Sequence, residues 1–132
     1  MLGKFASVIL IAATGLATPV EAKEVFPPEF FGWAMDRAIA QQIAKGCHEF
    51  RFDKSKADRT EKELEASLKA RGYSTSDMYR MLDNVPKKQA QDEFLKYVQK
   101  NNIDMTARDG FCPVGQKEYA AQSGIGRFLK AK

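Results

Sequence analysis

Two cysteines and one histidine are the residues of this sequence best suited to chemistry. Cys47 and Cys112 are the only cysteines and lie 65 positions apart, and the only histidine, His48, directly follows the first of them. In an oxidising compartment such a pair forms a disulfide, whereas in a reducing one it suggests metal binding or catalysis. The compartment therefore decides how the pair is interpreted.

The first 22 residues predict export. Lys4 gives a positive start, residues 5–16 form an apolar, alanine-rich run, and Val20-Glu21-Ala22 matches the positions that a signal peptidase reads. A retained membrane anchor is the alternative, but the apolar run is shorter than the ~20 residues needed to span a bilayer. We expect cleavage after Ala22, which leaves residues 23–132 as a single periplasmic domain without a transmembrane segment.

Export favours a structural disulfide between Cys47 and Cys112. The stretch from Ala44 to His48 resembles the Cys-x-x-Cys-His signature of c-type haem attachment, but Ala44 stands at the first cysteine position. A one-cysteine haem site with His48 as axial ligand would leave Cys112 unpaired in an oxidising compartment. A one-cysteine haem protein is therefore the least favoured alternative, and we expect no cofactor.

The same three residues do not predict a metal site or a catalytic centre. Zinc would need Cys47, His48 and Cys112 plus a carboxylate, a set without a familiar ligand spacing and in competition with the disulfide. A Ser-His-Asp arrangement would depend on His48 and on serines that lie at helix caps or termini. We expect no metal, no cofactor and no catalytic residue, and hence a protein that is not an enzyme.

The charge balance argues against nucleic acid as a partner. The chain has 21 basic and 17 acidic residues, a net charge of +4, and the two signs are mixed along its length. Such a surface favours solubility rather than binding to nucleic acid.

Hydrophobic periodicity predicts an all-α fold, a small bundle of four or five helices stapled by one disulfide. In the first helix, apolar residues recur every four positions and end at Cys47, which directs its sulfur toward the core. This stripe is Phe31, Met35, Ile39, Ile43 and Cys47. No stretch alternates long enough to predict a strand. The expected helices span residues 29–46, 55–71, a short segment after 74, 86–101, and 113 to the C-terminus.

Capping residues set several of these boundaries. Gly72 ends the second helix, and Ser74 and Asp77 have the spacing of a capping box for the third. The asparagines at 101 and 102 can end the fourth helix in a left-handed turn. The apolar residues expected to point inward from the short third helix are Met78, Met81 and Leu82.

Three aromatic residues near the start of the first helix are candidate partner-binding residues. Phe30, Phe31 and Trp33 fall within four positions, so they cannot all face one core. Either at least one is exposed as an anchor for a partner, or the cluster caps the bundle against the residues before it. The sequence leaves both interpretations open.

Four segments together resemble a small exported alphaproteobacterial family of unknown function. They are Cys47 after the first helix, Arg71-Gly72-Tyr73-Ser74, Phe111-Cys112 with Gly115, and residues 123–129. The resemblance covers most of the mature chain, and its C-terminal stretch is the most specific part. It implies a helical periplasmic protein with two cysteines and no assigned activity.

The sequence therefore favours a non-enzymatic module that binds another protein. The expected partner is periplasmic or membrane-associated. In size, helicity and single disulfide the chain is also similar to the acid-stress chaperones of the bacterial periplasm, although the similarity is one of architecture and not of motif. An acid-activated holdase is the alternative hypothesis.

Overall fold

The computed structural model describes Gly15 and residues 26–132, so the predicted signal peptide, apart from Gly15, lies outside the described residues. Five helices account for most of the described chain, which confirms the predicted all-α bundle. They are α1 (Pro28–Gly46), α2 (Lys54–Ala70), α3 (Thr75–Asp83), α4 (Lys87–Lys100) and α5 (Cys112–Ala121). Within the described part of the chain, no helix has the length and apolar character needed to cross a membrane.

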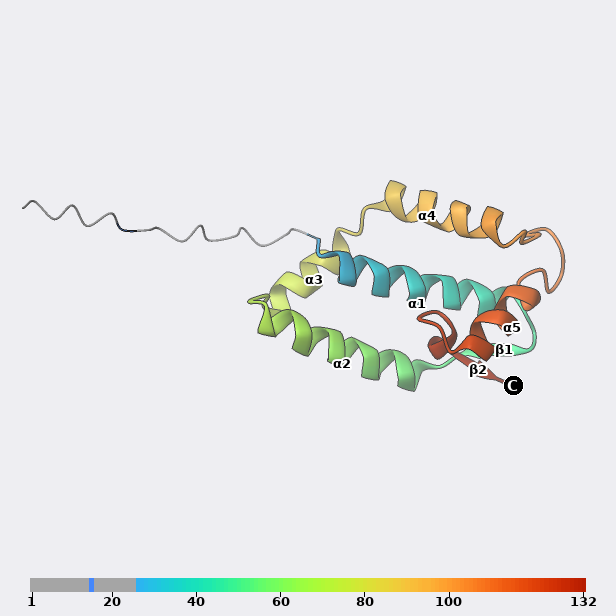
Figure 1. The fold of residues 1–132 in the computed structure, drawn as a ribbon, viewed down its shortest axis with the longest axis horizontal. Coiled ribbons are helices and arrows are strands. Elements are labelled where there is room, and N and C mark those ends of the chain that lie inside the picture. The colour runs from blue at the N-terminus through green and yellow to red at the C-terminus, as the bar shows by residue number, and fades with distance from the viewer. Residues whose placement is uncertain (1–14, 16–25) are drawn as a thin grey trace, which may run out of the picture.

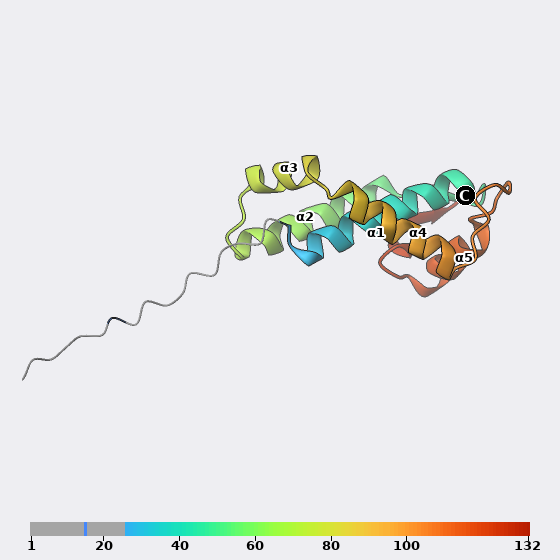
Figure 2. The ribbon, with the colours of Figure 1, turned by 90° about the horizontal axis from the view of Figure 1, so that it is seen from above.

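The long helix α1 is the centre of the molecule (Figure 1). It runs between α2 and α4, while α3 joins the two outer helices at one end (Figures 1 and 2). At the opposite end α5 and the C-terminal segment pack against the last turns of α1. Because α1 has neighbours on several sides, more than one of its faces is apolar.

The buried face of α1 differs from the predicted four-residue stripe. Its buried members are Phe30, Trp33, Ile39, Ala40 and Ile43. The expected core residues Phe31 and Met35 are only half-buried. A regular period of four assumes one packing partner, whereas α1 turns one side toward α2 and another toward α4.

The predicted capping signals are confirmed. Ser74 and Asp77 form a complete capping box at the start of α3, with a hydrogen bond from the Asp77 N–H to Ser74 Oγ at 3.0 Å. Gly72 ends α2 with φ 90°, and Asn102 follows α4 with φ 51°. These turns are determined by local side-chain and backbone chemistry, which explains why the sequence predicts them.

Two short strands form a sheet that the sequence did not predict. Strand β1 (Phe50–Phe52) pairs antiparallel with β2 (Leu129–Ala131), and Phe50 lies opposite Ala131. Each strand has three residues, which is too short for an alternating pattern to be recognised.

The prediction that the last helix continues to the C-terminus is wrong. Helix α5 ends at Ala121, and Gln122 adopts a left-handed conformation with φ 46°. A single turn of 3₁₀ helix, η1 (Gly126–Phe128), then leads into β2. Phe128 and Leu129 are fully buried, so the segment that breaks the helix becomes part of the core.

The disulfide between Cys47 and Cys112 is confirmed, with an S–S distance of 2.00 Å and a Cα–Cα distance of 4.9 Å. It joins the residue after α1 to the first residue of α5. The bond therefore connects the central helix to the C-terminal part of the core.

Candidate functional site

The three candidate aromatic residues do not share one environment. Phe30 and Trp33 are buried, with 3% and 6% of their surfaces exposed, whereas Phe31 is half-buried on another side of α1. Trp33 donates a hydrogen bond from Nε1 to Thr60 Oγ1 at 3.2 Å, which ties α1 to α2. Two of the three therefore belong to the core.

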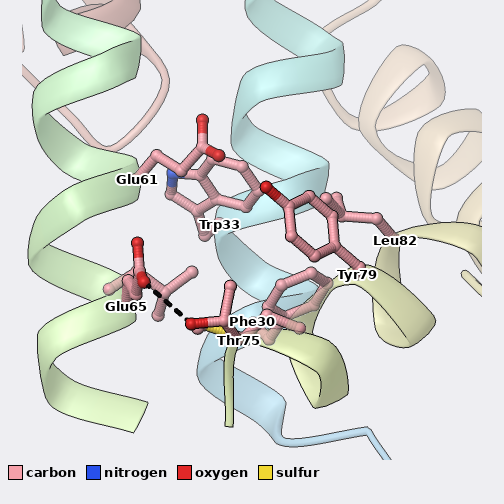
Figure 3. Close-up of a pocket in the computed structure, with 9 residues that line it drawn as sticks. Phe30, Trp33, Glu61, Glu65, Thr75, Tyr79 and Leu82 are labelled. Carbon is pink, nitrogen blue, oxygen red and sulfur yellow. Dashed lines mark hydrogen bonds between the residues drawn. The ribbon is translucent and has the colours of Figure 1, made fainter. Parts of the chain in front are cut away.

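A groove nevertheless opens above the buried pair, between α1, α2 and α3 (Figure 3). Its enclosed volume is about 50 Å³, enough for a small apolar side chain. The residues that line it come from all three helices: Phe30, Trp33, Glu61, Leu64, Glu65, Thr75, Met78, Tyr79 and Leu82. We call this feature the aromatic groove.

The floor of the aromatic groove is held in place by its own contacts. The rings of Phe30 and Trp33 lie with centroids 5.8 Å apart, and Phe26 meets Phe30 edge-on at 5.2 Å. Thr60, which accepts the Trp33 hydrogen bond, donates its hydroxyl to the Ala57 carbonyl at 2.9 Å. These contacts fix the positions of the two rings that form the floor.

One wall of the aromatic groove exposes apolar side chains to solvent. Tyr79 is 65% and Leu82 is 40% exposed, and both belong to α3. Figure 3 shows Tyr79 beside Trp33 and Phe30, with Leu82 next to it on the side away from Glu61 and Glu65. The prediction that Leu82 points into the core is wrong, because the short α3 buries only Met78 and Met81.

The opposite wall is acidic. Glu61 and Glu65 come from α2, and Glu65 accepts a hydrogen bond from Thr75 Oγ1 at 3.3 Å (Figure 3). Glu65 also pairs with Lys69 at 2.8 Å, and this bond and charge hold the pKa of its carboxyl below the usual value. The groove thus combines an apolar floor with negative charge at its edge.

Phe31 lines a second, more open cleft between α1 and α4. Asp36 and Tyr97 also line this cleft, and together with Glu118 and Arg127 they form a polar cluster contributed by four elements. The Tyr97 hydroxyl donates to Glu118 Oε1 at 3.2 Å. The cluster joins α4 and α5 beside the central helix.

Burial dominates the acid–base behaviour of this polar cluster. It raises the pKa of Asp36, against an opposing attraction from Arg127, and Glu118 adds to the rise. Burial also raises the pKa of Tyr97, and the nearby Glu118 carboxylate raises it further. Tyr97 therefore remains a neutral hydrogen-bond donor over the physiological pH range.

His48, just beyond the end of α1, pairs with Asp109 in the loop before α5. Its Nδ1 lies 2.8 Å from Asp109 Oδ2, and its backbone N–H donates to Asp109 Oδ1 at 2.8 Å. Both bonds favour the charged carboxylate, so the pKa of Asp109 is lowered. The histidine thus links the end of α1 to the loop before α5.

Sequence reasoning missed the aromatic groove because its wall residues, from Glu61 to Leu82, are 28 to 52 positions from Phe30 and Trp33 on its floor. The groove residues that it missed include Tyr79, Leu82 and Glu61, and in the separate polar cluster it missed Asp36. One signal was present: α3 carries four apolar residues, Met78, Tyr79, Met81 and Leu82, within five positions, more than one face of a short helix can bury.

The described chain defines a class of small, disulfide-stapled helical proteins with an aromatic groove at one end. The chain belongs to a family of unknown function (DUF5333), whose model matches residues 29–130. No curated protein and no solved structure matches it.

Proposed function

We propose that this protein is a non-enzymatic, exported helical module that binds another protein through the aromatic groove. The observation that carries the proposal is the exposed wall of Tyr79 and Leu82 beside a buried aromatic floor. Apolar side chains exposed around a small, pre-formed hollow are typical of surfaces that anchor a partner residue. Export rests on the sequence of residues 1–22, and the disulfide is compatible with it.

The groove also indicates the chemistry of the partner. Its apolar floor accommodates one small apolar side chain, and Glu61 and Glu65 place negative charge beside it. A partner segment with an apolar residue next to a lysine or arginine would satisfy both features. The groove lining is suited to binding a partner side chain, because it combines apolar groups with the carboxylates of Glu61 and Glu65.

Site-specific photo-cross-linking tests the proposal. Leu82 and Leu95 are exposed to nearly the same extent, 40% and 41%, but only Leu82 lines the groove. A photoreactive phenylalanine analogue replaces each leucine in turn, and the protein is expressed in the organism that naturally produces it. We expect a discrete cross-linked species from position 82 and none from position 95. The same products from both positions, or none from either, would contradict the proposal.

Binding measurements with the purified cross-linked partner complete the test. We expect Leu82→Asp and Glu61→Lys each to weaken binding by tenfold or more, while Leu95→Asp leaves it unchanged. Because Leu82 and Glu61 are exposed, neither change should lower the melting temperature appreciably. Equal affinities for all variants would place the interface elsewhere.

An acid-activated holdase is the second candidate, and the cap of α3 supports it. Hydrogen bonds from Ser74 lower the pKa of Asp77, the acidic member of the capping box. A lowered pKa in the folded state contributes stability that is lost as pH falls through it. Acid would therefore loosen α3, whose buried Met78 lines the aromatic groove.

A client-aggregation assay decides this second candidate. A holdase should suppress aggregation of a denatured client at about pH 3 and should be inactive at neutral pH, where the Asp77 carboxylate completes the capping box. Ser74→Ala removes the other half of the cap and should shift the onset of activity to higher pH. Protein that stays inert at acid pH removes the holdase function.

A further inference from the structure

The small sheet places two positive charges face to face. Arg51 and Lys130 are partners in the antiparallel pairing of β1 with β2, and both residues are exposed. Like charges at facing positions of two strands repel each other and destabilise the pair. Among the residues that the structure describes, neither side chain has an ion-pair partner, so no carboxylate offsets this repulsion by direct contact.

These two cations lie beside a hollow between the end of α1 and the sheet. The hollow has a volume of about 350 Å³, and Lys45, Arg51 and Lys132 line it. The two phenylalanines of β1 line it as well and give it an apolar part, whereas no described aspartate or glutamate does so. We call this feature the basic hollow and count Lys130, which faces Arg51 across the sheet, among its cations.

The carboxylates on either side of β1 are engaged elsewhere. Glu49 Oε2 accepts a hydrogen bond from Gln116 Nε2 at 2.8 Å, and Asp53 Oδ1 accepts one from the Lys56 N–H at 3.0 Å. In the described chain the other two cations of the basic hollow also form no ion pair. Four cations keep the hollow positive even beside the carboxylate of the last residue, so its charge is left for an anionic group from another molecule.

We propose that the basic hollow is a docking surface for an acidic segment of a partner protein, one in which an apolar residue lies next to aspartates or glutamates. The carboxylates of such a segment complement the four cations, and its apolar residue meets the phenylalanine side chains. The basic hollow lies at the end of the molecule opposite α3 and the aromatic groove (Figure 1). It therefore does not depend on the function proposed for that groove.

The lining of the basic hollow favours a protein segment over a membrane surface. Membrane-binding surfaces combine basic residues with apolar side chains that project into the lipid. Phe50 is only 4% exposed, and the half-buried Phe52 ring stacks on Phe128 with centroids 6.0 Å apart. The large apolar side chains that the described chain exposes lie outside the sheet: Tyr79, Leu82, Leu95 and Met105. The apolar part of the hollow can thus receive a side chain but cannot enter a bilayer.

Fluorescence anisotropy with three short labelled peptides tests the proposal. The first peptide contains glutamates and leucines, the second has glutamine in place of every glutamate, and the third has serine in place of every leucine. We expect the first to bind most tightly at low salt, the third more weakly and the second not at all. Salt at about 0.5 M should abolish the binding, because it screens exposed charges. Equal binding of the first two peptides, or no binding of the first, would overturn the proposal.

Charge-reversal variants show whether the peptide binds at the basic hollow. Arg51→Glu and Lys130→Glu should each weaken binding of the acidic peptide about fivefold to tenfold. Lys87→Glu is the matched control, since Lys87 is an exposed lysine of α4 that also forms no ion pair in the described chain. Equal affinities of these three variants would mean attraction by net charge alone and would overturn the site.

Lys130→Glu also separates lost binding from lost folding. It places opposite charges across the sheet, so its melting temperature should equal or exceed that of the wild type. Leu82→Asp, which changes the aromatic groove, should leave the affinity for the acidic peptide unchanged, so the two proposals can fail separately. Co-sedimentation with phosphatidylglycerol vesicles that is lost in Lys130→Glu, in a protein that binds no acidic peptide, would assign the hollow to a membrane and overturn the proposal.

Discussion

Among the acidic side chains that the structure describes, Asp36 is the one whose surroundings most clearly disfavour the ionised form of the carboxyl. It lies half-buried on α1, and a Cβ on Gly124 would lie 2.4 Å from its Oδ2, so the C-terminal segment passes directly over the carboxylate. Burial and the nearby Glu118 raise its pKa more than Arg127 lowers it. The ionised form of Asp36 therefore destabilises the folded state.

Replacing Asp36 by Asn should stabilise the protein at neutral pH. A pKa raised by folding means that the carboxyl favours the folded state when protonated and loses this advantage as pH rises. The melting temperature of D36N should exceed that of the wild type at about pH 7 and equal it at about pH 3. Solvent screening of a half-exposed charge keeps the gain below about 1 kcal/mol.

A matched control separates this effect from the loss of any negative charge. Glu63 is an exposed carboxylate on α2, so E63Q removes the same charge from the surface. Thermal denaturation of both variants across the pH range gives the comparison. A D36N curve parallel to that of E63Q would show that burial does not govern Asp36.

At the level of elements, the C-terminal segment is the least regular part of the fold and one of the most buried. After α5 the chain passes through η1 into β2, and Gly126, Phe128 and Leu129 are all buried. Gly126 lies against the last turns of α5, because a Cβ at this position would come within 1.9 Å of the Glu118 carbonyl oxygen. Backbone atoms cannot move aside as a flexible side chain can.

Gly126→Ala should therefore destabilise the protein, whereas Gly32→Ala should not. A methyl group in this packed position costs about 1–3 kcal/mol. Gly32 lies inside α1 with nothing within 4 Å of an added Cβ. Alanine at that position should stabilise the helix by about 0.5–1 kcal/mol. Urea denaturation of both variants measures the two effects, and similar stabilities would show that the C-terminal segment adapts to the methyl group.

The same segment shows which elements were predictable from sequence. Helices α2, α3 and α4 carry their boundaries in local signals such as Gly72 and the Ser74 capping box. The end of α5 depends on a left-handed Gln122 and on pairing between strands about 80 positions apart, for which no local signal exists. The excess of apolar residues on α3 was a local signal, but the aromatic groove itself could not be predicted, since Trp33 and Leu82 meet only in the folded chain.

For the whole molecule, the disulfide acts together with the contacts around it. It closes a loop of 65 residues between α1 and α5, the helices to which η1 and the small sheet also attach. In the chain-entropy model this cross-link contributes about 4 kcal/mol by restricting the unfolded chain. A domain of this size has a total stability of about 5–15 kcal/mol, so the bond supplies a large part of it.

The variant with both cysteines replaced by Ala should thus be folded but much less stable. We expect its free energy of unfolding to fall by about 4 kcal/mol, because the unfolded chain regains its freedom. Its helix content at low temperature should be kept, since the Phe111–Gly46 and Gln116–Glu49 contacts remain. Denaturant unfolding with and without reductant measures both quantities. Reductant should lower the stability of the wild type and leave that of the variant unchanged. A variant as stable as the oxidised wild type would show that the Phe111–Gly46 and Gln116–Glu49 contacts hold α1 and α5 together without the disulfide.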